Sequence, residues 1–435
     1  MSTSRLRVVH VIDSLAGSGG AENRLVDEVI ALDDRFDQTV VRLFERDFLE
    51  ARLTAAGIPV VALGFLAGRA GRTWPLVARR LTAELRDLRP DVIHTSLFTG
   101  NLVGQLAGWR LGVPVVSTFN RTGELSLQRE LQAGVASWKG RVMQSIGRWA
   151  VDRGDVHYRA VGEYARETNC ASLGLALDRA TVVPRGVALA TGAAGDGGDD
   201  ALAGGRADRA AFGVPDGVPL FANVARLVPE KAQHLLVEAF ALAREQVPDA
   251  HLAIAGAPGP AEAAVLDAIG RTGTGEVVHL LGFRDDARDL VAVADVFTFS
   301  SISEGAPGAV VEAMALGAPV AAFAIPPVAE LTEGDRYGWM AEVGSAGALA
   351  TAMLGAWRDP DRRERAAAGR RHAAERYSLT AVARQLGDLL ERRAGRDPST
   401  GSVASTDADA ASGAVAVPDS GSRVSDPGPG QAVER

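Results

Sequence analysis

Two glutamates, Glu304 and Glu312, lie eight positions apart in the stretch SSISEGAPGAVVEAMALGA from Ser300 to Ala318. The preceding VFTFS has the apolar, β-branched and aromatic composition of a buried strand, SEGAPG has the composition of a loop, and residues 309–316 predict a short helix. Glu304 is therefore expected at the C-terminal edge of a strand, and Glu312 about one turn into the next helix. Both can then face the crevice where open α/β sheets bind ligands. Carboxylates there can accept hydrogen bonds from vicinal hydroxyls, such as those of a ribose or a hexose.

A second stretch, FANVARLVPEKAQHLLVEAF from Phe221 to Phe240, has two cations, with Arg226 ending a predicted strand and Lys231 opening a predicted helix. Pro229 suits the first turn of that helix, where its missing N–H costs nothing. Phosphate is attracted to the unpaired N–H groups and positive end of a helix, and Arg and Lys add charge-assisted contacts. The stretch therefore predicts a diphosphate site. Taken singly, these features have simpler interpretations: the glutamates could lie on a solvated helix face, and the cations could pair at the surface with Glu230 or Glu238.

The spacing from Glu304 to Glu312 resembles the Glu-x7-Glu signature of the retaining family 4 glycosyltransferases, and residues 221–240 resemble the diphosphate motif of the same family. The resemblance covers about residues 5 to 392 and is weakest between 120 and 215. It implies an α/β chain of GT-B architecture, with two Rossmann-like parallel-sheet domains facing a central cleft. It also implies a hexosyltransferase that moves a hexose from a UDP- or GDP-sugar to a hydroxyl acceptor, with a lipid-linked saccharide or a cell-surface polysaccharide precursor as candidate acceptors.

The resemblance implies a role for each motif residue. In this family the departing diphosphate is thought to accept the proton of the acceptor, so Arg226, Lys231 and Glu304 would act by positioning and by stabilising charge. Glu304 is expected on donor-sugar hydroxyls and Glu312 on the ribose. Further donor contacts are expected from two glycine-containing loops and from the segment LLGFRD, which together supply Gly19, Gly20, Gly282, Phe283, Gly305, Ala306, Pro307 and Gly308.

The donor contacts at Phe283, Gly19 and Gly20 have ordinary structural alternatives. Phe283 could be a core residue, and the glycines at 17–20 could form a plain tight turn. Their spacing does not match the dinucleotide GxGxxG pattern, which argues against a nicotinamide enzyme. The seven histidines are scattered without pairs at metal-ligand spacing, so we expect no metal and no cofactor beside the donor substrate. No nucleic-acid partner is expected.

The acceptor side departs from the family pattern. Many relatives have a His shortly after the PVV-type strand, whereas this chain reads PVVSTFNRTG and offers Asn120, which cannot titrate near neutrality. His94, in PDVIHTS, matches a family position, but a structural His at a strand end explains it equally well. Pro326 and Pro327 replace a glycine-rich turn before Glu330 and make that loop stiff, which would narrow the donor-sugar pocket.

Two other functions remain open from the sequence. A sugar-nucleotide epimerase of the same architecture would need additional acid–base residues around the sugar, and the sequence offers none that stand out. A non-catalytic partner that binds the donor or a companion transferase is compatible with Asn120 and with the proline-stiffened loop. The presence of all four motif residues, Arg226, Lys231, Glu304 and Glu312, favours the transferase.

The elements that must position these residues alternate between strands and helices in two halves. Strands are predicted at 7–12, 38–43, 59–62, 91–94 and 113–117, and again at 220–225, 250–256, 277–281, 295–300 and 319–324. We expect an acceptor-side domain over 1–185, a flexible insertion at 186–213 and a nucleotide-sugar domain over 214–376. A last helix at 377–394, which in GT-B proteins returns toward the first domain, and a disordered tail at 395–435 complete the chain.

Length and composition fit a cytoplasmic protein of more than one domain. A chain of 435 residues exceeds the usual limit for one core, and its single cysteine, Cys170, fits a reducing compartment. The N-terminus lacks the apolar run of a signal peptide, and no membrane span is predicted. Basic residues interleaved with Trp138, Met143, Ile146 and Trp149 predict an amphipathic helix, either packed on a core or lying on an anionic membrane at its inner face.

Overall fold

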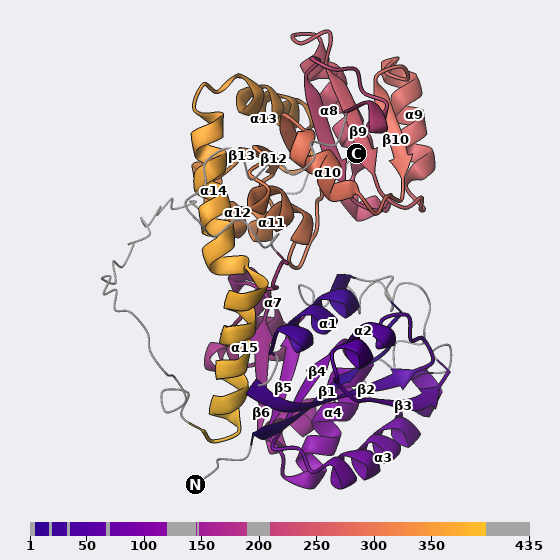
Figure 1. The fold of residues 1–435 in the computed structure, drawn as a ribbon, viewed down its shortest axis with the longest axis vertical. Coiled ribbons are helices and arrows are strands. Elements are labelled where there is room, and N and C mark those ends of the chain that lie inside the picture. The colour runs from indigo at the N-terminus through magenta and orange to yellow at the C-terminus, as the bar shows by residue number, and fades with distance from the viewer. Residues whose placement is uncertain are drawn as a thin grey trace, which may run out of the picture. The chain divides into compact units, whose positions relative to one another are not determined.

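The computed structural model of the chain describes residues 5–16, 20–32, 35–66, 70–119, 145, 148–188 and 209–396 (Figure 1). Predictions that concern Gly19, Asn120, most of the insertion at 186–213, the tail from 397 onward and Trp138, Met143 and Ile146 lie outside the described residues.

The first sheet has seven strands, all in parallel pairs, in the order β3-β2-β1-β4-β5-β6-β7. Its elements are β1 (Leu6–Ile12), α1 (Gly20–Leu32), β2 (Phe36–Phe44), α2 (Glu50–Ala55), β3 (Val60–Phe65), α3 (Ala70–Leu88), β4 (Val92–Ser96), α4 (Phe98–Leu111), β5 (Val115–Phe119), β6 (Val156–Ala160), α7 (Glu163–Leu173) and β7 (Ala180–Val182). The order reverses between β1 and β4, which makes the C-terminal ends of these two strands a topological switch point.

The second sheet has six parallel strands in the order β10-β9-β8-β11-β12-β13. Its elements are β8 (Leu220–Val224), α8 (Gln233–Arg244), β9 (His251–Ala255), α9 (Glu262–Thr272), β10 (Val278–Gly282), α10 (Ala287–Val293), β11 (Val296–Phe299), α11 (Gly308–Ala315), β12 (Val320–Phe323), α12 (Pro326–Thr332), β13 (Trp339–Ala341), α13 (Ala346–Arg358) and α14 (Arg362–Tyr377). Here the order reverses between β8 and β11. The expected α/β fold with two Rossmann-like parallel-sheet domains is confirmed.

Hydrophobic side chains cover both faces of each sheet. In the first sheet, Val9 and Val11 pack with α3 and α4 on one face, whereas Val8 and Val92 pack on the opposite face. This alternation is the period of two that a strand imposes on its side chains. The second sheet is covered in the same way, by α8, α9 and α13 on one face and by α11, α12 and α14 on the other.

The last helix, α15 (Leu379–Arg393), packs on the first sheet although it follows the second in the chain (Figure 1). Its residues Val382, Leu386 and Leu390 are buried in one cluster with Val8 and Val116. The chain passes between the two sheets twice, after β7 and before α15, and hydrogen bonds join these two places. Val187 of the connecting segment donates to the carbonyl of Tyr377 at 2.8 Å and accepts from Leu379 N at 2.9 Å. The contact ties the connection after β7 to the start of α15.

The sequence analysis missed three strands, β6, β7 and β13. Strand β6 reads VHYRA, in which His157 and Arg159 interrupt the apolar pattern although the strand is buried. Strands β7 and β13 have three residues each, which is too short for a periodic signal. Among the described helices, none combines the length and the apolarity that a bilayer span requires.

Candidate functional site

The two predicted motifs meet at the switch point of the second sheet. Arg226 follows β8 and Glu304 follows β11, and these two strands are hydrogen-bonded neighbours. The loops are joined by two further bonds, from Ser300 Oγ to the carbonyl of Lys231 at 2.8 Å and from Ile302 N to the carbonyl of Glu230 at 3.0 Å. Residues about seventy positions apart therefore share the edge of the sheet at which such folds bind ligands.

Lys231 and Glu304 form an ion pair in this loop region, with 19% and 15% of their side chains exposed. Nζ of Lys231 also lies 5.6 Å from the ring centre of Phe299, the last residue of β11. The two side chains are too buried for the simpler interpretation, in which Glu304 would lie on a solvated helix face. The surface pairs considered for Lys231 are also not formed among the described residues, since Glu238 pairs instead with Arg271 at 2.8 Å.

The expectation that Pro229 and Lys231 open the helix after β8 is wrong in detail. Pro229–Lys231 form a separate 3-10 turn, and α8 begins only at Gln233. The break comes from Ala232, whose φ of 45° is left-handed and cannot continue the turn. Gln233, which is buried, holds the preceding segment by donating from Nε2 to the carbonyl of Arg226 at 2.9 Å. Lys231 therefore projects from a turn ahead of the helix rather than from its first residues.

Arg226 is exposed, and its guanidinium makes no hydrogen bond or ion pair with the part of the chain that the structure describes. Its backbone is tightly fixed, because a Cβ on Gly256 would lie 1.9 Å from the carbonyl oxygen of Ala225 and 3.1 Å from Arg226 N. The end of β9 thus approaches this segment so closely that only glycine fits. Arg226 combines a fixed backbone with a cation that is available to a ligand.

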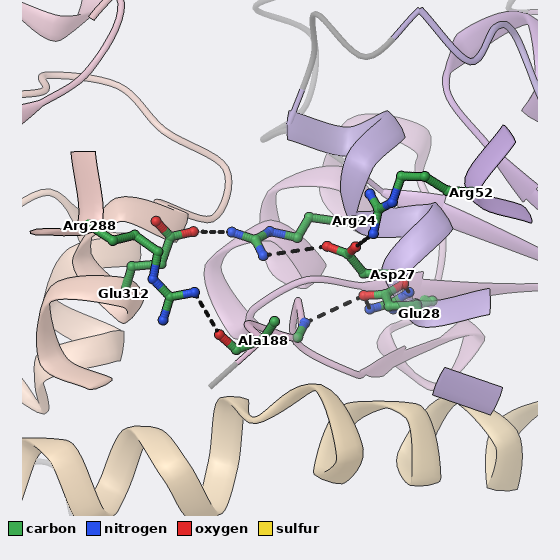
Figure 2. A network of polar contacts seen from close by, with 9 residues as sticks. Arg24, Asp27, Glu28, Arg52, Ala188, Arg288 and Glu312 are labelled. Atoms are coloured by element: carbon green, nitrogen blue, oxygen red, sulfur yellow. Dashed lines mark hydrogen bonds and ion pairs between the residues drawn. The ribbon is translucent and has the colours of Figure 1, made fainter. Parts of the chain in front are cut away.

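Glu312 lies on α11 and forms an ion pair with Arg24 of α1, which belongs to the first sheet's half of the chain (Figure 2). Arg24 is also 3.8 Å from Asp27, and Asp27 accepts from Arg52 at 2.7 Å. Arg24 was not among the predicted site residues. Its partner could not be found from sequence because the two positions are 288 residues apart.

The segment that leads into α11 contains four predicted donor contacts, which are Gly305, Ala306 and Pro307 ahead of the helix and Gly308 at its first position. Helix α11 begins at Gly308, one residue earlier than expected, and Pro307 at its N-cap gives no side-chain hydrogen bond to the first amides. A cavity of about 300 Å³ adjoins Gly305 and Ala306. Its other walls come from both halves of the chain, and they include Gly162, Pro184, Glu330, Arg376, Tyr377 and Gln385.

Phe283 is 73% exposed, so the alternative that it belongs to the core is wrong. It follows Gly282, which ends β10 with a left-handed φ of 66° and accepts a hydrogen bond from Gly256 N at 2.7 Å. The turn places an exposed aromatic ring at the C-terminal edge of β10. That position suits the stacking of a base, although no contact of the described residues tests this role.

His94 is a buried, hydrogen-bonded residue within the sheet, which matches the alternative of a structural His rather than a substrate contact. It is buried, its Nδ1 lies 3.0 Å from Nδ1 of His10, and its Nε2 lies 3.0 Å from Oγ1 of Thr118. Burial is the largest cause that holds the pKa of His94 well below its usual value, and His10 and Arg159 act in the same direction. Because both ring nitrogens already have partners inside the sheet, we do not retain His94 as an acceptor contact.

Glu330, which follows the two prolines, does not point at solvent. Its carboxylate accepts from the backbone N of Glu163 at 2.8 Å and from Tyr164 N at 3.3 Å, and so caps the start of α7. Pro326 and Pro327 open α12, where their missing N–H groups cost nothing. Glu330 thus connects the two halves of the chain, and the proposed effect of the prolines on a sugar pocket stays a prediction.

Two further charged residues with shifted pKa values were missed by the sequence analysis. Asp13 follows β1 at the switch point of the first sheet, and burial raises the pKa of its carboxyl to about 6 although Gly100 N donates to it at 2.6 Å. Arg185 follows β7 in the connecting segment, and burial lowers its pKa to about 10 against the opposing effect of Glu28 and Glu304. Neither residue forms a recognisable motif.

The described part of the predicted amphipathic helix packs against the fold. Trp149 makes an edge-to-face contact with Trp109 of α4, with ring centres 4.4 Å apart, and Arg153 lies over the Trp149 ring at 4.9 Å. Within the described ranges, no group of three or more His, Cys, Asp or Glu side chains could hold a metal ion. The expectations for membrane and metal stay predictions.

Comparison with family models assigns both halves of the chain. Residues 18–191 match the model described as Glycosyltransferase Family 4, and residues 206–372 match the model described as Glycosyl transferases group 1. Together the two matches include all four motif residues, Arg226, Lys231, Glu304 and Glu312, and Gly20 of the N-terminal loop.

Relatives of known name are similar over part of their length. The chain is 32% identical over 186 residues to the putative colanic acid biosynthesis glycosyltransferase WcaL of Salmonella typhimurium, which is 40% of this chain and 46% of the relative. It is 31% identical over 245 residues to the D-inositol 3-phosphate glycosyltransferase of Mycolicibacterium gilvum, which is 54% of this chain and 51% of the relative. The chain thus spans about half the length of these relatives.

Solved structures share the fold. Anabaena Alr3699/HepE, in complex with UDP and glucose, superposes with a TM-score of 0.71 at 21% identity over 89% of this chain and 100% of that chain. WaaG, a glycosyltransferase involved in lipopolysaccharide biosynthesis, superposes with a TM-score of 0.66 at 16% identity over 88% of this chain and 99% of that chain. At these identities the likeness concerns the fold alone.

Proposed function

Because the chain belongs to the glycosyltransferases, with a Family 4 domain followed by a group 1 domain, we propose that it transfers a hexose from a nucleotide-diphosphate sugar to a hydroxyl acceptor and retains the anomeric configuration. The observation that carries the proposal is the pairing of Lys231 with Glu304 at the switch point of the second sheet. One partner suits a diphosphate and the other suits sugar hydroxyls, and they come from separate motifs.

The donor would bind with its diphosphate near Lys231, Arg226 and the amides that precede α11. Arg226 is exposed and not paired with any described residue, and the α11 amides have no side-chain cap. Glu304 would then accept hydrogen bonds from the donor sugar, and the exposed Phe283 would stack on the base. Among the candidate donors we favour UDP-sugars, because HepE, a neighbour in fold, has been solved with UDP-glucose.

The reaction would proceed by displacement on one face of the sugar. The bond from the anomeric carbon to the diphosphate oxygen breaks, the acceptor oxygen bonds to that carbon, and the diphosphate takes the acceptor's proton. Lys231 and Arg226 stabilise the charge on the diphosphate as it leaves. The proposed acceptor is a lipid-linked saccharide or polysaccharide precursor, which the naming of WcaL as a colanic acid biosynthesis protein supports. Such an acceptor would place the protein in the cytoplasm, at the inner membrane face.

The proposal is tested by turnover with UDP- and GDP-hexoses in the presence of a mixture of lipid-linked saccharide acceptors. We expect acceptor-dependent release of the nucleoside diphosphate and an α-linked product from an α-linked donor. Lys231→Ala and Glu304→Gln should each slow release at least 10-fold, since each removes a charge-assisted contact. Arg271→Ala, which removes an exposed pair on α9, is the matched control and should be as active as the wild type.

Two results would contradict the proposal. A new sugar nucleotide formed from the donor alone would indicate an epimerase instead of a transferase. Equal rates for the wild type, Lys231→Ala and Glu304→Gln would show that the paired residues are not the reaction site.

A further inference from the structure

Both carboxylates of the Glu-x7-Glu motif are paired with a cation, and the two cations come from different halves of the chain. Lys231, which pairs with Glu304, belongs to the second sheet's half. Arg24, which pairs with Glu312, belongs to α1 and therefore to the first half (Figure 2). Nothing in the motif itself predicts a partner for Glu312 from α1.

Arg24 also lies at the start of α11, where the diphosphate is expected. Its Nη2 is 3.5 Å from the position that a Cβ on Gly308, the first residue of α11, would occupy. The side chains of Arg24 and Glu312 are 20% and 29% exposed, so a ligand can reach both. The guanidinium therefore lies between the carboxylate that would bind the ribose and the helix end that would bind phosphate.

Arg24 is held in this position by Asp27 on the same helix. Asp27, one turn further along α1, lies 3.8 Å from Nη1 of Arg24, and Arg52 of α2 donates to the same carboxylate at 2.7 Å (Figure 2). Because Asp27 contacts Nη1 of Arg24, the other terminal nitrogen, Nη2, is directed at Glu312. A guanidinium with five donors can keep one carboxylate while exchanging another acceptor.

We propose that Arg24 is a donor-binding residue that exchanges Glu312 for the diphosphate when the nucleotide binds. This inference rests on the proposed function and deepens it. In the structure Glu312 neutralises Arg24; in the complex the phosphate oxygens take that position and Glu312 turns to the ribose hydroxyls. The exchange keeps Arg24 paired, because the diphosphate brings the negative charge that replaces the carboxylate, while Glu312 accepts hydrogen bonds from the ribose hydroxyls instead. It also makes binding of the donor depend on α1, so that the first half of the chain contributes a cation to a site in the second.

The test compares a nucleoside diphosphate with its nucleoside. Binding of UDP, GDP, uridine and guanosine to the full chain is measured by calorimetry for the wild type, Arg24→Gln and Arg24→Lys. Arg24→Gln should lower the affinity for the better-binding nucleoside diphosphate at least 10-fold. Its affinity for the matching nucleoside should be unchanged or higher, since Glu312 is then free for the ribose. Arg24→Lys should recover part of the loss because it restores the charge without the fork geometry.

Arg271→Gln is the matched control, because it removes an exposed cation on α9 that pairs with Glu238 and Asp267 and contacts neither Arg24 nor Glu312, and it should bind both ligands like the wild type. Circular dichroism of each variant verifies that it is folded. If Arg24→Gln binds the diphosphate as the wild type does, or binds diphosphate and nucleoside more tightly to the same degree, Arg24 is not a phosphate ligand and the inference is wrong.

Lys231→Ala distinguishes failure of this inference from failure of the proposed function. If Lys231→Ala weakens the diphosphate while Arg24→Gln does not, the site is as proposed but lacks Arg24. If the wild type binds neither UDP nor GDP, the proposed function and the role of Arg24 fail together. If Lys231→Ala binds them unchanged while Arg24→Gln binds them more weakly, the proposed role of Lys231 is wrong and Arg24 remains a phosphate ligand.

Discussion

Replacing Arg159 by Met tests the buried ion pair that fixes the connection between the two sheets. Arg159 lies on β6 and Glu28 on α1, and the side chains are 2% and 3% exposed. Two guanidinium nitrogens donate to the two oxygens of Glu28 at 2.6 and 2.7 Å. The same guanidinium donates to the carbonyls of Val183 at 3.0 Å and Pro184 at 2.5 Å, which lie in the segment that leaves the first sheet.

The expected loss of stability is about 3–5 kcal/mol. Two unit charges about 4 Å apart attract by about 4 kcal/mol at an effective dielectric of 20. Removing one partner of a buried pair typically costs about 3–5 kcal/mol, because the other charge stays buried without compensation. Met has similar length and fills the space of the stem, so the lost bonds rather than a cavity should dominate. For a folding unit of this size each kcal/mol lowers the melting temperature by about 2–4 °C, which gives a decrease of about 6–20 °C.

The assay is thermal unfolding at pH 7, followed by circular dichroism and calorimetry. Arg7→Met is the matched control, because Arg7 forms an exposed pair at 3.6 Å with Asp91, which precedes the neighbouring strand β4, and this variant should lose less than about 1 kcal/mol. A double variant, Glu28→Met with Arg159→Met, should recover part of the loss, since Glu28 is then no longer buried without Arg159. A decrease of less than about 1 kcal/mol for Arg159→Met alone would refute the assignment of this pair as the anchor of the connection.

Three smaller perturbations have defined outcomes. Burial raises the pKa of Asp13 from 3.8 to about 6, so the folded state binds the proton more tightly than the unfolded state. The stability gained from this proton is complete below about pH 4 and is lost as the pH rises through about 6. Asp13→Asn should therefore raise the melting temperature at pH 8 and change it little at pH 4; an equal change at both pH values would contradict the assigned cause. Gly256→Ala should weaken UDP or GDP binding as well as lower the melting temperature, because its Cβ would displace the backbone that carries Arg226. Gly270→Ala in α9, which meets nothing within 4 Å, is its control and should stabilise by about 0.5–1 kcal/mol; equal behaviour of the two variants would exclude the close approach. Ser345→Ala should lose about 1 kcal/mol in thermal unfolding because Ser345 Oγ accepts from Ala348 N at 3.2 Å at the start of α13, and no loss would mean that water replaces the cap.

Local patterns were sufficient to predict most of the fold. The ten strands that the sequence predicted are all present, since buried parallel strands produce apolar, β-branched runs. Strand β6 was missed because His157 and Arg159 are buried in it, and their partners Thr181 and Glu28 could not be foreseen from a window of a few residues. A buried charge becomes compatible with a strand only once its distant counter-ion is known.

The site residues likewise fall into those that a local motif predicts and those that depend on distant contacts. The motif residues of the second half were predicted because each motif lies on one strand–loop–helix unit, and the neighbouring positions of β8 and β11 then bring Lys231 to Glu304. Arg24 and Glu312 could not be paired in advance, because their contact depends on how two separate sheets are connected. The left-handed Ala232, which moves Lys231 off the helix, also has no sequence signal, since alanine ordinarily favours the helix.

The central claim is that Lys231, Glu304 and their neighbours form a site for a nucleotide-diphosphate sugar. The most direct test is a calorimetric titration of UDP-glucose and a GDP-hexose into the wild type and into Glu304→Gln. We predict saturable binding of one of the two donors to the wild type and at least 10-fold weaker binding to Glu304→Gln, because the amide cannot replace a carboxylate that accepts from two hydroxyls. Equal affinity of the two proteins for the donor, or no binding of either donor to the wild type, would contradict the account.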